Sequence, residues 1–139
     1  MVQGIEFYDI SNNGQLDHIS HFSLSQNAKA NCVEAYANHA YFTSRNGLYV
    51  VDISNPSNPQ NLGRVSGTNN LILENLDAEN NLLAVAAHAD GVLIYDISDP
   101  QNLELKSIIN CVNAWCARIK DGYVYIGDGI NLMIYDISV

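Results

Sequence analysis

Four aspartates recur along this sequence in the same setting, each followed by an Ile: Asp9, Asp52, Asp96 and Asp136. Repeated carboxylates suit two kinds of chemistry, because a hard cation needs several oxygen ligands and glycoside hydrolysis needs two carboxyls flanking one bond. Here each Asp closes an apolar segment beside a Ser and a turn, where its carboxylate can accept hydrogen bonds from turn amides. We therefore predict a structural role for these aspartates.

The predicted structural motif includes the Ser that follows each Asp-Ile pair, together with Gly and Pro residues at the ends of the segment. Its members are Asp9, Ser11, Gly47, Asp52, Ser54, Pro56, Gly91, Asp96, Ser98, Pro100, Asp136 and Ser138. Consecutive copies fall in separate units of the chain, so we do not expect their carboxylates to meet at one site.

Other groups lack the spacing of a catalytic or metal centre. Cys32, Cys111 and Cys116 do not have the short paired spacing of a zinc site, and we expect buried thiols that act as small hydrophobes. His18 and His21 are three apart on an expected strand and should point to opposite faces, where they cannot bind one ion together. The sequence predicts no catalytic residue, no metal site and no cofactor.

A repeat positions the aspartates. They end near-copies of one segment, at residues 4–11, 47–54, 91–98 and 131–138, and successive aspartates are separated by 43, 44 and 40 residues. A period of this length is typical of repeat architectures. Turns rich in Asn, Asp, Gly and Pro separate short apolar segments, and no segment has a sustained helical period, so the pattern predicts an all-β fold.

Each full period contains four expected strands, in one domain with repeat units of about 1–29, 30–70, 71–110 and 111–139. The units contribute two, four, four and three strands, which makes thirteen. The expected strands are 4–10, 16–24, 32–36, 40–43, 48–53, 62–65, 71–78, 82–87, 91–98, 103–109, 114–119, 123–127 and 131–138.

The repeated segment is apolar on both alternating faces. Leu48 and Val50 share one face, and Tyr49 and Val51 share the other. A sheet with two apolar faces is covered on both sides. Four-stranded antiparallel blades, each sandwiched between its neighbours around an axis, meet this condition. The pattern predicts a partial β-propeller of about three blades, and a β-sandwich ranks second because it would leave one face polar.

The segments around the second and third aspartates also resemble a known repeat. Residues 47–59 are Gly-Leu-Tyr-Val-Val-Asp-Ile-Ser-Asn-Pro-Ser-Asn-Pro, and residues 91–100 are Gly-Val-Leu-Ile-Tyr-Asp-Ile-Ser-Asp-Pro. With them the chain resembles the LVIVD repeat family over nearly its whole length. The resemblance implies a β-propeller, found in bacterial proteins that are often surface-associated or secreted. It carries over no catalytic residue.

Net charge indicates which classes of partner to expect, and the apolar runs bear on the cellular location. The formal net charge is −9, and the six Lys and Arg residues are scattered. Nucleic acid and anionic membranes need clustered cations, so neither is an expected partner. The acidity serves solubility or, as the second choice, a cationic partner. The N-terminal segment lacks a leader pattern and no apolar run matches a membrane span. These features favour the cytoplasm, and the resemblance also allows secretion or surface association.

Two functions from different classes remain open. The first is a non-catalytic scaffold for protein or ligand interactions, with Trp115 and Arg118 of the last unit's innermost strand as a binding hot spot. Trp115 equally fits a packing slot between blades. The second is an enzyme or small-ligand site in the central channel, where acidic residues of innermost strands, such as Glu34, Asp77 and Glu79, would converge. Convergence of Glu34, Asp77 and Arg118 within about 10 Å would favour the second function.

About three blades fall short of the roughly four to eight that closed propellers contain. We expect an apolar blade face at each end of the stack. Either a second copy, placed head to tail so that each N-terminus completes the partner's last blade, or further blades of a longer chain would cover these faces.

Overall fold

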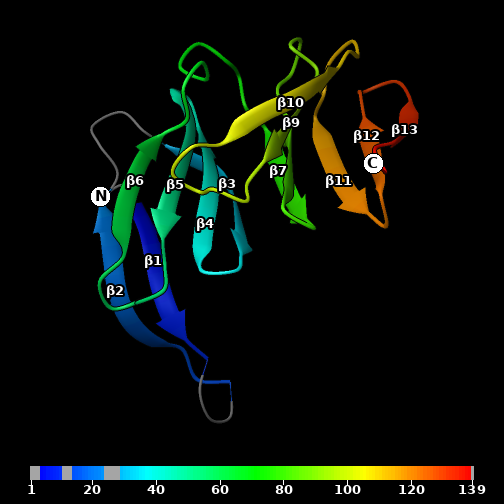
Figure 1. Ribbon diagram of the computed structural model, residues 1–139. Coiled ribbons are helices and arrows are strands. Elements are labelled where there is room, and N and C mark those ends of the chain that lie inside the picture. Colours follow the sequence, from blue (N-terminus) through cyan, green and yellow to red (C-terminus); the bar gives the residue numbers. More distant parts are fainter. Residues whose placement is uncertain (1–3, 11–13, 24–28, 139) are drawn as a thin grey trace.

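The computed structural model describes residues 4–10, 14–23 and 29–138. Within these residues the chain forms thirteen strands and no helix, so the all-β prediction is confirmed (Figure 1). The strands are β1 (Gly4–Asp9), β2 (Asp17–Ser23), β3 (Ala30–Tyr36), β4 (His39–Ser44), β5 (Gly47–Asp52), β6 (Gln60–Arg64), β7 (Asn75–Glu79), β8 (Leu82–Ala86), β9 (Val92–Asp96), β10 (Glu104–Ile109), β11 (Cys116–Lys120), β12 (Tyr123–Gly127) and β13 (Leu132–Asp136). The part of the chain that the structure describes therefore contains no helix that could cross a membrane.

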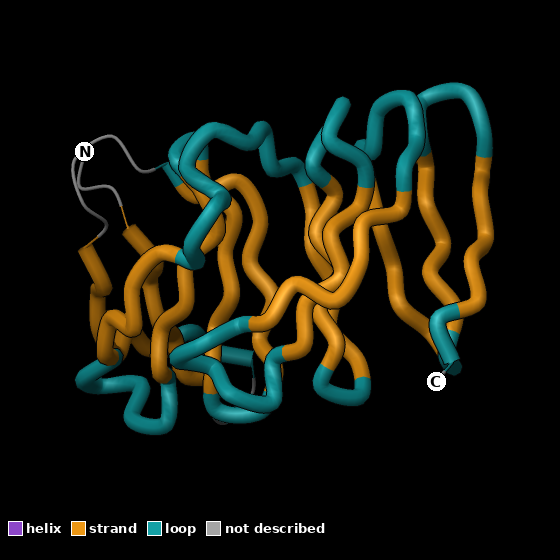
Figure 2. Tube along the Cα trace, turned by 45° about the horizontal axis from the view of Figure 1, so that its top comes forward, coloured by secondary structure: helices purple, strands orange, loops and turns teal. Residues whose placement is uncertain are grey.

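The strands form four antiparallel sheets that follow one another along the chain. β1 and β2 form the N-terminal hairpin, β3 to β6 the first blade, β7 to β10 the second blade, and β11 to β13 the last blade. The first strands of successive blades lie against each other, β3 against β7 and β7 against β11, and form an inner row. Loops gather at the two ends of the strands (Figure 2).

We call the strands that carry the repeated apolar segment, β1, β5, β9 and β13, the signature strands. Local side-chain chemistry turns the chain after two of them, β5 and β9. The side chains of Asn55 and Asp99 accept hydrogen bonds from N–H groups two residues farther along, at 3.1 and 3.0 Å, which fixes the turn that contains the following Pro. Before β9, Gly91 has a φ of +82°, and a Cβ there would lie 2.3 Å from the carbonyl oxygen of Ile109. Only Gly fits this position.

Two apolar cores join the blades. Between the first and second blades, Leu48 and Val50 of β5 pack with Leu93 and Tyr95 of β9. Ile94, on the other face of β9, belongs to the core between the second and last blades. Both faces of β5 and β9 are buried, as the apolar alternation predicts.

Burial on both faces is wrong for the two outer signature strands, β1 and β13. In β13, Leu132 and Ile134 are 72% and 58% exposed, because no sheet of the described chain lies against that face. Met133 and Tyr135, on the opposite face, pack against the core of the last blade. In β1 the exposed positions include Tyr8.

Several expected strand boundaries also differ from those observed, and two of the differences affect the candidate site. The strand expected at 71–78 begins at Asn75, because the preceding residues form the connection from β6, where Leu73 is buried in the first core. The strand expected at 114–119 begins at Cys116. Trp115 therefore lies in the connection before β11 and not on the innermost strand.

Candidate functional site

The inner row brings together the charged residues predicted for the channel. Nη1 of Arg118 on β11 lies 3.3 Å from Oδ1 of Asp77 on β7, and also donates to the carbonyl oxygen of Leu76. Glu34 on β3 lies close enough to this pair for both charges to act on its carboxyl. Asp77 and Arg118 therefore pair between two neighbouring inner strands, and Glu34 lies within the influence of both charges.

Glu34 has an unusual environment among these residues. Burial raises the pKa of its carboxyl, the charge of Asp77 raises it further, and Arg118 lowers it. A carboxyl with a raised pKa is a feature of general acids in enzymes. In residues 4–10, 14–23 and 29–138, no group of three or more His, Cys, Asp or Glu side chains is arranged to hold a metal ion.

Asp77 belongs to a row of three side chains on β7 that bind the edge of β11. Because β11 is the edge strand of its sheet, alternate N–H groups point away from β12 and need partners. The acceptors are Asn75 Oδ1, Asp77 Oδ2 and Glu79 Oε2, and the donors, in the same order, are the N–H groups of Ala117, Ile119 and Asp121, at 3.4, 2.8 and 2.8 Å. We call this row the acceptor ladder. Both carboxylate oxygens of Asp77 are therefore used in bonds between blades.

One repeat farther on, the positions of the acceptor ladder carry Cys116, Arg118 and Lys120, of which the two cations are donors only. Nζ of Lys120 donates to Oε1 of Glu79 at 3.2 Å. Hydrogen bonds to Glu79 and Asp121 raise the pKa of Lys120. Both cations of β11 thus turn back toward the carboxylates of β7.

The sequence did not predict the acceptor ladder, although a signal for it was present. In β7 the polar residues Asn75, Asp77 and Glu79 alternate with the apolar Leu76 and Ala78. Such alternation indicates a strand with one polar face. Besides any role in the channel, Asp77 and Glu79 thus accept backbone N–H groups of the next blade.

The motif aspartates make local bonds. Oδ1 of Asp52, Asp96 and Asp136 accepts the N–H group of the Ser two residues on, at 2.8, 2.9 and 2.9 Å. The Ser98 and Ser138 hydroxyls also donate to Asp96 and Asp136. These bonds lower the pKa of all three carboxyls, chiefly through the backbone N–H at Asp52 and through the Ser hydroxyl at the other two. Ser11 of the first copy lies outside the described residues.

The two histidines of β2 share one face, so the prediction that they point to opposite faces is wrong. Nε2 of His18 and Nδ1 of His21 lie 2.8 and 2.6 Å from the two carboxylate oxygens of Glu6, and these bonds lower the pKa of Glu6. The cause is a register shift between Phe7 and Tyr8, because a bulge breaks the two-residue alternation of a strand.

Trp115 lies at a loop end of the strands, in the connection from the second blade to the last. Its ring meets the edge of the His88 ring, with centroids 4.8 Å apart and planes at 79°. It also lies beside Gly129, where a Cβ would be 3.0 Å from Nε1 of Trp115. Trp115 is 50% exposed, so it does not fill a buried slot, and Ile130, which follows Gly129 in the chain, is 78% exposed. We call His88, Trp115 and Ile130 the Trp115 patch.

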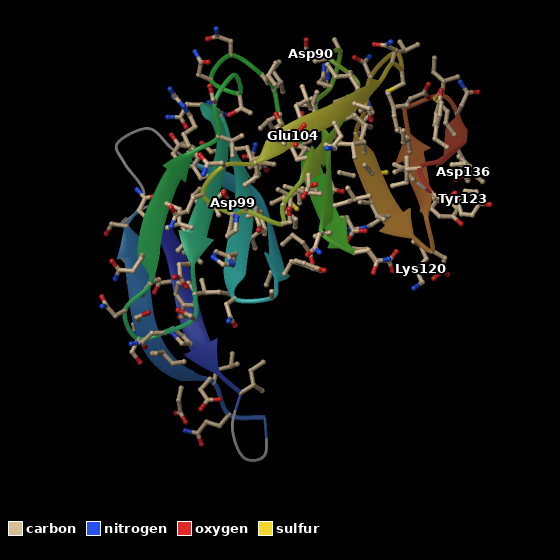
Figure 3. The ribbon with its side chains drawn as sticks, viewed as in Figure 1. Asp90, Asp99, Glu104, Lys120, Tyr123 and Asp136 are labelled. Carbon is tan, nitrogen blue, oxygen red and sulfur yellow. The ribbon has the colours of Figure 1, made fainter. Side chains whose placement is uncertain are left out.

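The last blade presents a second exposed surface on the side away from the other blades. We define its open face by four exposed side chains of β12 and β13: Tyr123, Tyr125, Leu132 and Ile134. Figure 3 shows Tyr123 and Asp136 on this outermost sheet, with Asp90 and Lys120 at opposite loop ends of the strands. Cys116 is exposed, which corrects the expectation of a buried thiol, while Cys32 and Cys111 pack partly buried against the two cores.

Three cavities lie away from the channel residues. One of about 260 Å³ lies between β6 and the turn at 100–103, and one of about 500 Å³ is lined by residues that include Arg45 and Ile72. A third adjoins β9 and β10. None of these three cavities is lined by Glu34, Asp77 or Arg118.

Comparison with known families identifies the repeat. The LVIVD repeat matches residues 28–66, 75–111 and 113–139, which is most of the chain. The chain belongs to the LVIVD repeat family. A search of curated proteins finds no match to this LVIVD-repeat protein.

Solved structures share its fold. The computationally designed Ika4 protein has a TM-score of 0.75 and 17% identity, over 98% of this chain and 81% of Ika4. The computationally designed Ika8 protein has a TM-score of 0.69 and 19% identity, over 97% of this chain and 40% of Ika8. At these identities the likeness concerns the fold alone. With the LVIVD repeats, it makes the chain an all-β partial propeller whose sheets do not close.

Proposed function

We propose that this LVIVD-repeat protein is a non-catalytic scaffold that binds a polypeptide through the Trp115 patch. The observation that carries the proposal is the exposure of Trp115, in the connection before β11, and of Ile130, which follows Gly129 in the β12–β13 turn beside it. Tryptophan is enriched among the residues that dominate binding energy at interfaces. The net charge of −9 favours a partner with cationic side chains near its apolar ones.

The contacts of the inner row support a scaffold over an enzyme. Asp77 binds the Ile119 N–H group with one carboxylate oxygen and Arg118 with the other. A catalytic carboxylate must reach the reacting atoms, and these bonds leave Asp77 engaged in holding two blades together. Further blades, from a second copy or a longer chain, would complete the ring around this inner row.

A peptide selection with matched variants tests the scaffold. Peptides are selected from a displayed random library against the folded wild-type chain, and their affinities are measured for Trp115→Ala and for Leu105→Ala. Leu105 is an exposed apolar residue of β10, outside the patch. We expect Trp115→Ala to weaken the selected peptides at least about tenfold, which is about 1.4 kcal/mol, and Leu105→Ala to leave them unchanged. Selected peptides that bind Trp115→Ala as tightly as wild type would refute the proposal.

Glu34 supports a second candidate, a small-ligand or enzymatic site in the channel of the completed ring. Its carboxyl combines partial burial, a raised pKa and a neighbouring Arg118. A thermal-shift screen of small cations, sugars and amines tests this candidate. A channel site requires a compound that raises the melting temperature of wild type but not of Glu34→Gln. If every stabilising compound acts equally on both proteins, the channel candidate is excluded.

A further inference from the structure

We propose that two copies of this chain associate head to tail, with the open face of each last blade covered by the N-terminal hairpin of the other copy. This inference concerns the ends of the stack and does not depend on the Trp115 patch. The molecule that covers the open face is a second copy of the same chain.

The chain already makes this kind of interface twice. In the first core, Leu48 and Val50 of one signature strand pack with Leu93 and Tyr95 of the next. Their counterparts in β13 are Leu132 and Ile134, which lie on the open face. The open face therefore corresponds to the β5 side of the first core. Within the described residues, no strand packs against it as β9 packs against β5.

The N-terminal hairpin carries the matching half. Tyr8 precedes the Asp of its copy as Tyr95 precedes Asp96, yet Tyr8 is 49% exposed whereas Tyr95 is buried. Ile19 of β2 adds exposed apolar surface to the same hairpin. A blade packed in front of the hairpin would bury Tyr8 as the first blade buries Tyr95.

One position of the hairpin is polar where the packed copies are apolar. Glu6 replaces Leu93, and the hydrogen bonds from His18 and His21 give its carboxylate partners that remain when water is removed. Polar substitution at this position lets the hairpin face tolerate water in the free chain.

The hairpin is acidic, since it carries the exposed acids Glu6, Asp9 and Asp17 and no Lys or Arg occurs before Lys29. The last blade is not its electrostatic complement, because Arg118 and Lys120 are paired with Asp77 and Glu79 and the blade also carries Asp121, Asp128 and Asp136. The matching apolar faces, rather than charge, therefore orient the two copies.

The number of sheets favours a closed pair. Each copy has four sheets, so two copies have eight, and propellers contain roughly four to eight blades. β13 already pairs with β12 in the third position of the last blade. We therefore place the partner's hairpin as the next layer, in front of the last blade, rather than within that blade.

The oligomeric state of the full chain tests the proposal. Light scattering over a concentration series should give twice the 15.3 kDa of one chain for wild type. Ile134→Glu on the open face and Tyr8→Glu on the hairpin should each give the single-chain mass, with wild-type far-ultraviolet circular dichroism. Ile72→Glu is the matched control, because Ile72 is 59% exposed but lies in the β6–β7 connection, and it should keep the double mass.

A mixture of the two variants distinguishes head-to-tail packing from docking of two last blades on each other. Ile134→Glu keeps an intact hairpin and Tyr8→Glu keeps an intact open face, so together they should recover the double mass through one interface. A wild-type single-chain mass overturns the proposal, and so does a growing open filament. If Ile134→Glu separates the pair while Tyr8→Glu does not, the last blades dock on each other and head-to-tail packing is wrong.

Discussion

Ile94 and Ile134 occupy equivalent positions of consecutive repeats, two residues before the motif Asp, and provide a matched pair of substitutions. Ile94 is 3% exposed between the second and last blades, whereas Ile134 lies on the open face. Truncation to Ala removes the same three carbons at both positions. Any difference in the free energy of unfolding therefore reports what covers each residue.

The expected magnitudes differ severalfold. Three buried carbons correspond to about 2.4 kcal/mol of transfer free energy, and the cavity left behind brings Ile94→Ala to about 2–5 kcal/mol. At concentrations where the chain is single, Ile134→Ala should change stability by no more than about 0.5 kcal/mol, because its side chain is already in water. At high concentration its loss should grow, since association stabilises the folded wild type by mass action.

Guanidinium unfolding at two protein concentrations measures both effects. The slope with denaturant should be unchanged, so the shift in midpoint reports stability. Equal losses for Ile94→Ala and Ile134→Ala at every concentration would show that the chain itself covers the open face, and the description of the last blade as open would then be wrong.

Three further predictions follow from single side chains. Val50→Asp should abolish soluble folding, because an unpaired carboxylate buried between blades costs several kcal/mol, and a soluble variant with the wild-type melting temperature would contradict this. Asp96→Asn should lower the melting temperature only slightly, because it alters one local hydrogen bond to Ser98. Calcium or zinc should not shift the melting temperature of wild type, and a metal-dependent shift that is lost in the variant would show a metal site instead. Burial raises the pKa of Tyr41 to about 12 from its usual 10, so its stabilising effect is complete below pH 10 and is lost as the pH rises toward 12. Melting temperatures between pH 9 and pH 11 should fall less steeply for Tyr41→Phe than for wild type, and identical slopes would exclude Tyr41 as a source of alkaline instability.

The repeat made the blades predictable from sequence. Apolar residues on both faces of β5 and β9 specify a sheet that is covered twice, and the turn chemistry at Asn55 and Asp99 marks where each of these strands ends. Both signals are local, because they depend on alternation within one strand and on side chains two residues from their partners. Local signals of this kind can be recognised in one sequence without knowledge of the structure.

The features that sequence analysis missed depend on neighbours. The bulge that brings His18 and His21 together arises from the pairing of β1 with β2, and two-residue alternation alone gives the opposite answer. The role of Asp77 depends on which backbone edge lies against β7. The exposure of Leu132 depends on the sheet that is missing beside it, since its sequence setting matches that of the buried Leu48.

The number of interfaces decides how stable the proposed pair is. Burial of an apolar side chain such as Leu132 or Ile134 contributes about 1.5–3 kcal/mol, while association of two molecules loses about 4–15 kcal/mol of translational and rotational free energy. A closed head-to-tail pair incurs that loss once but buries two open faces, whereas a pair joined at one end buries only one. The mixed Ile134→Glu and Tyr8→Glu pair has a single intact interface, so its dissociation constant should exceed that of wild type by at least about tenfold for every 1.4 kcal/mol that the second interface contributes. Equal dissociation constants for the mixed pair and for wild type, measured by sedimentation, would mean that wild type also associates through one end only and that the ring does not close.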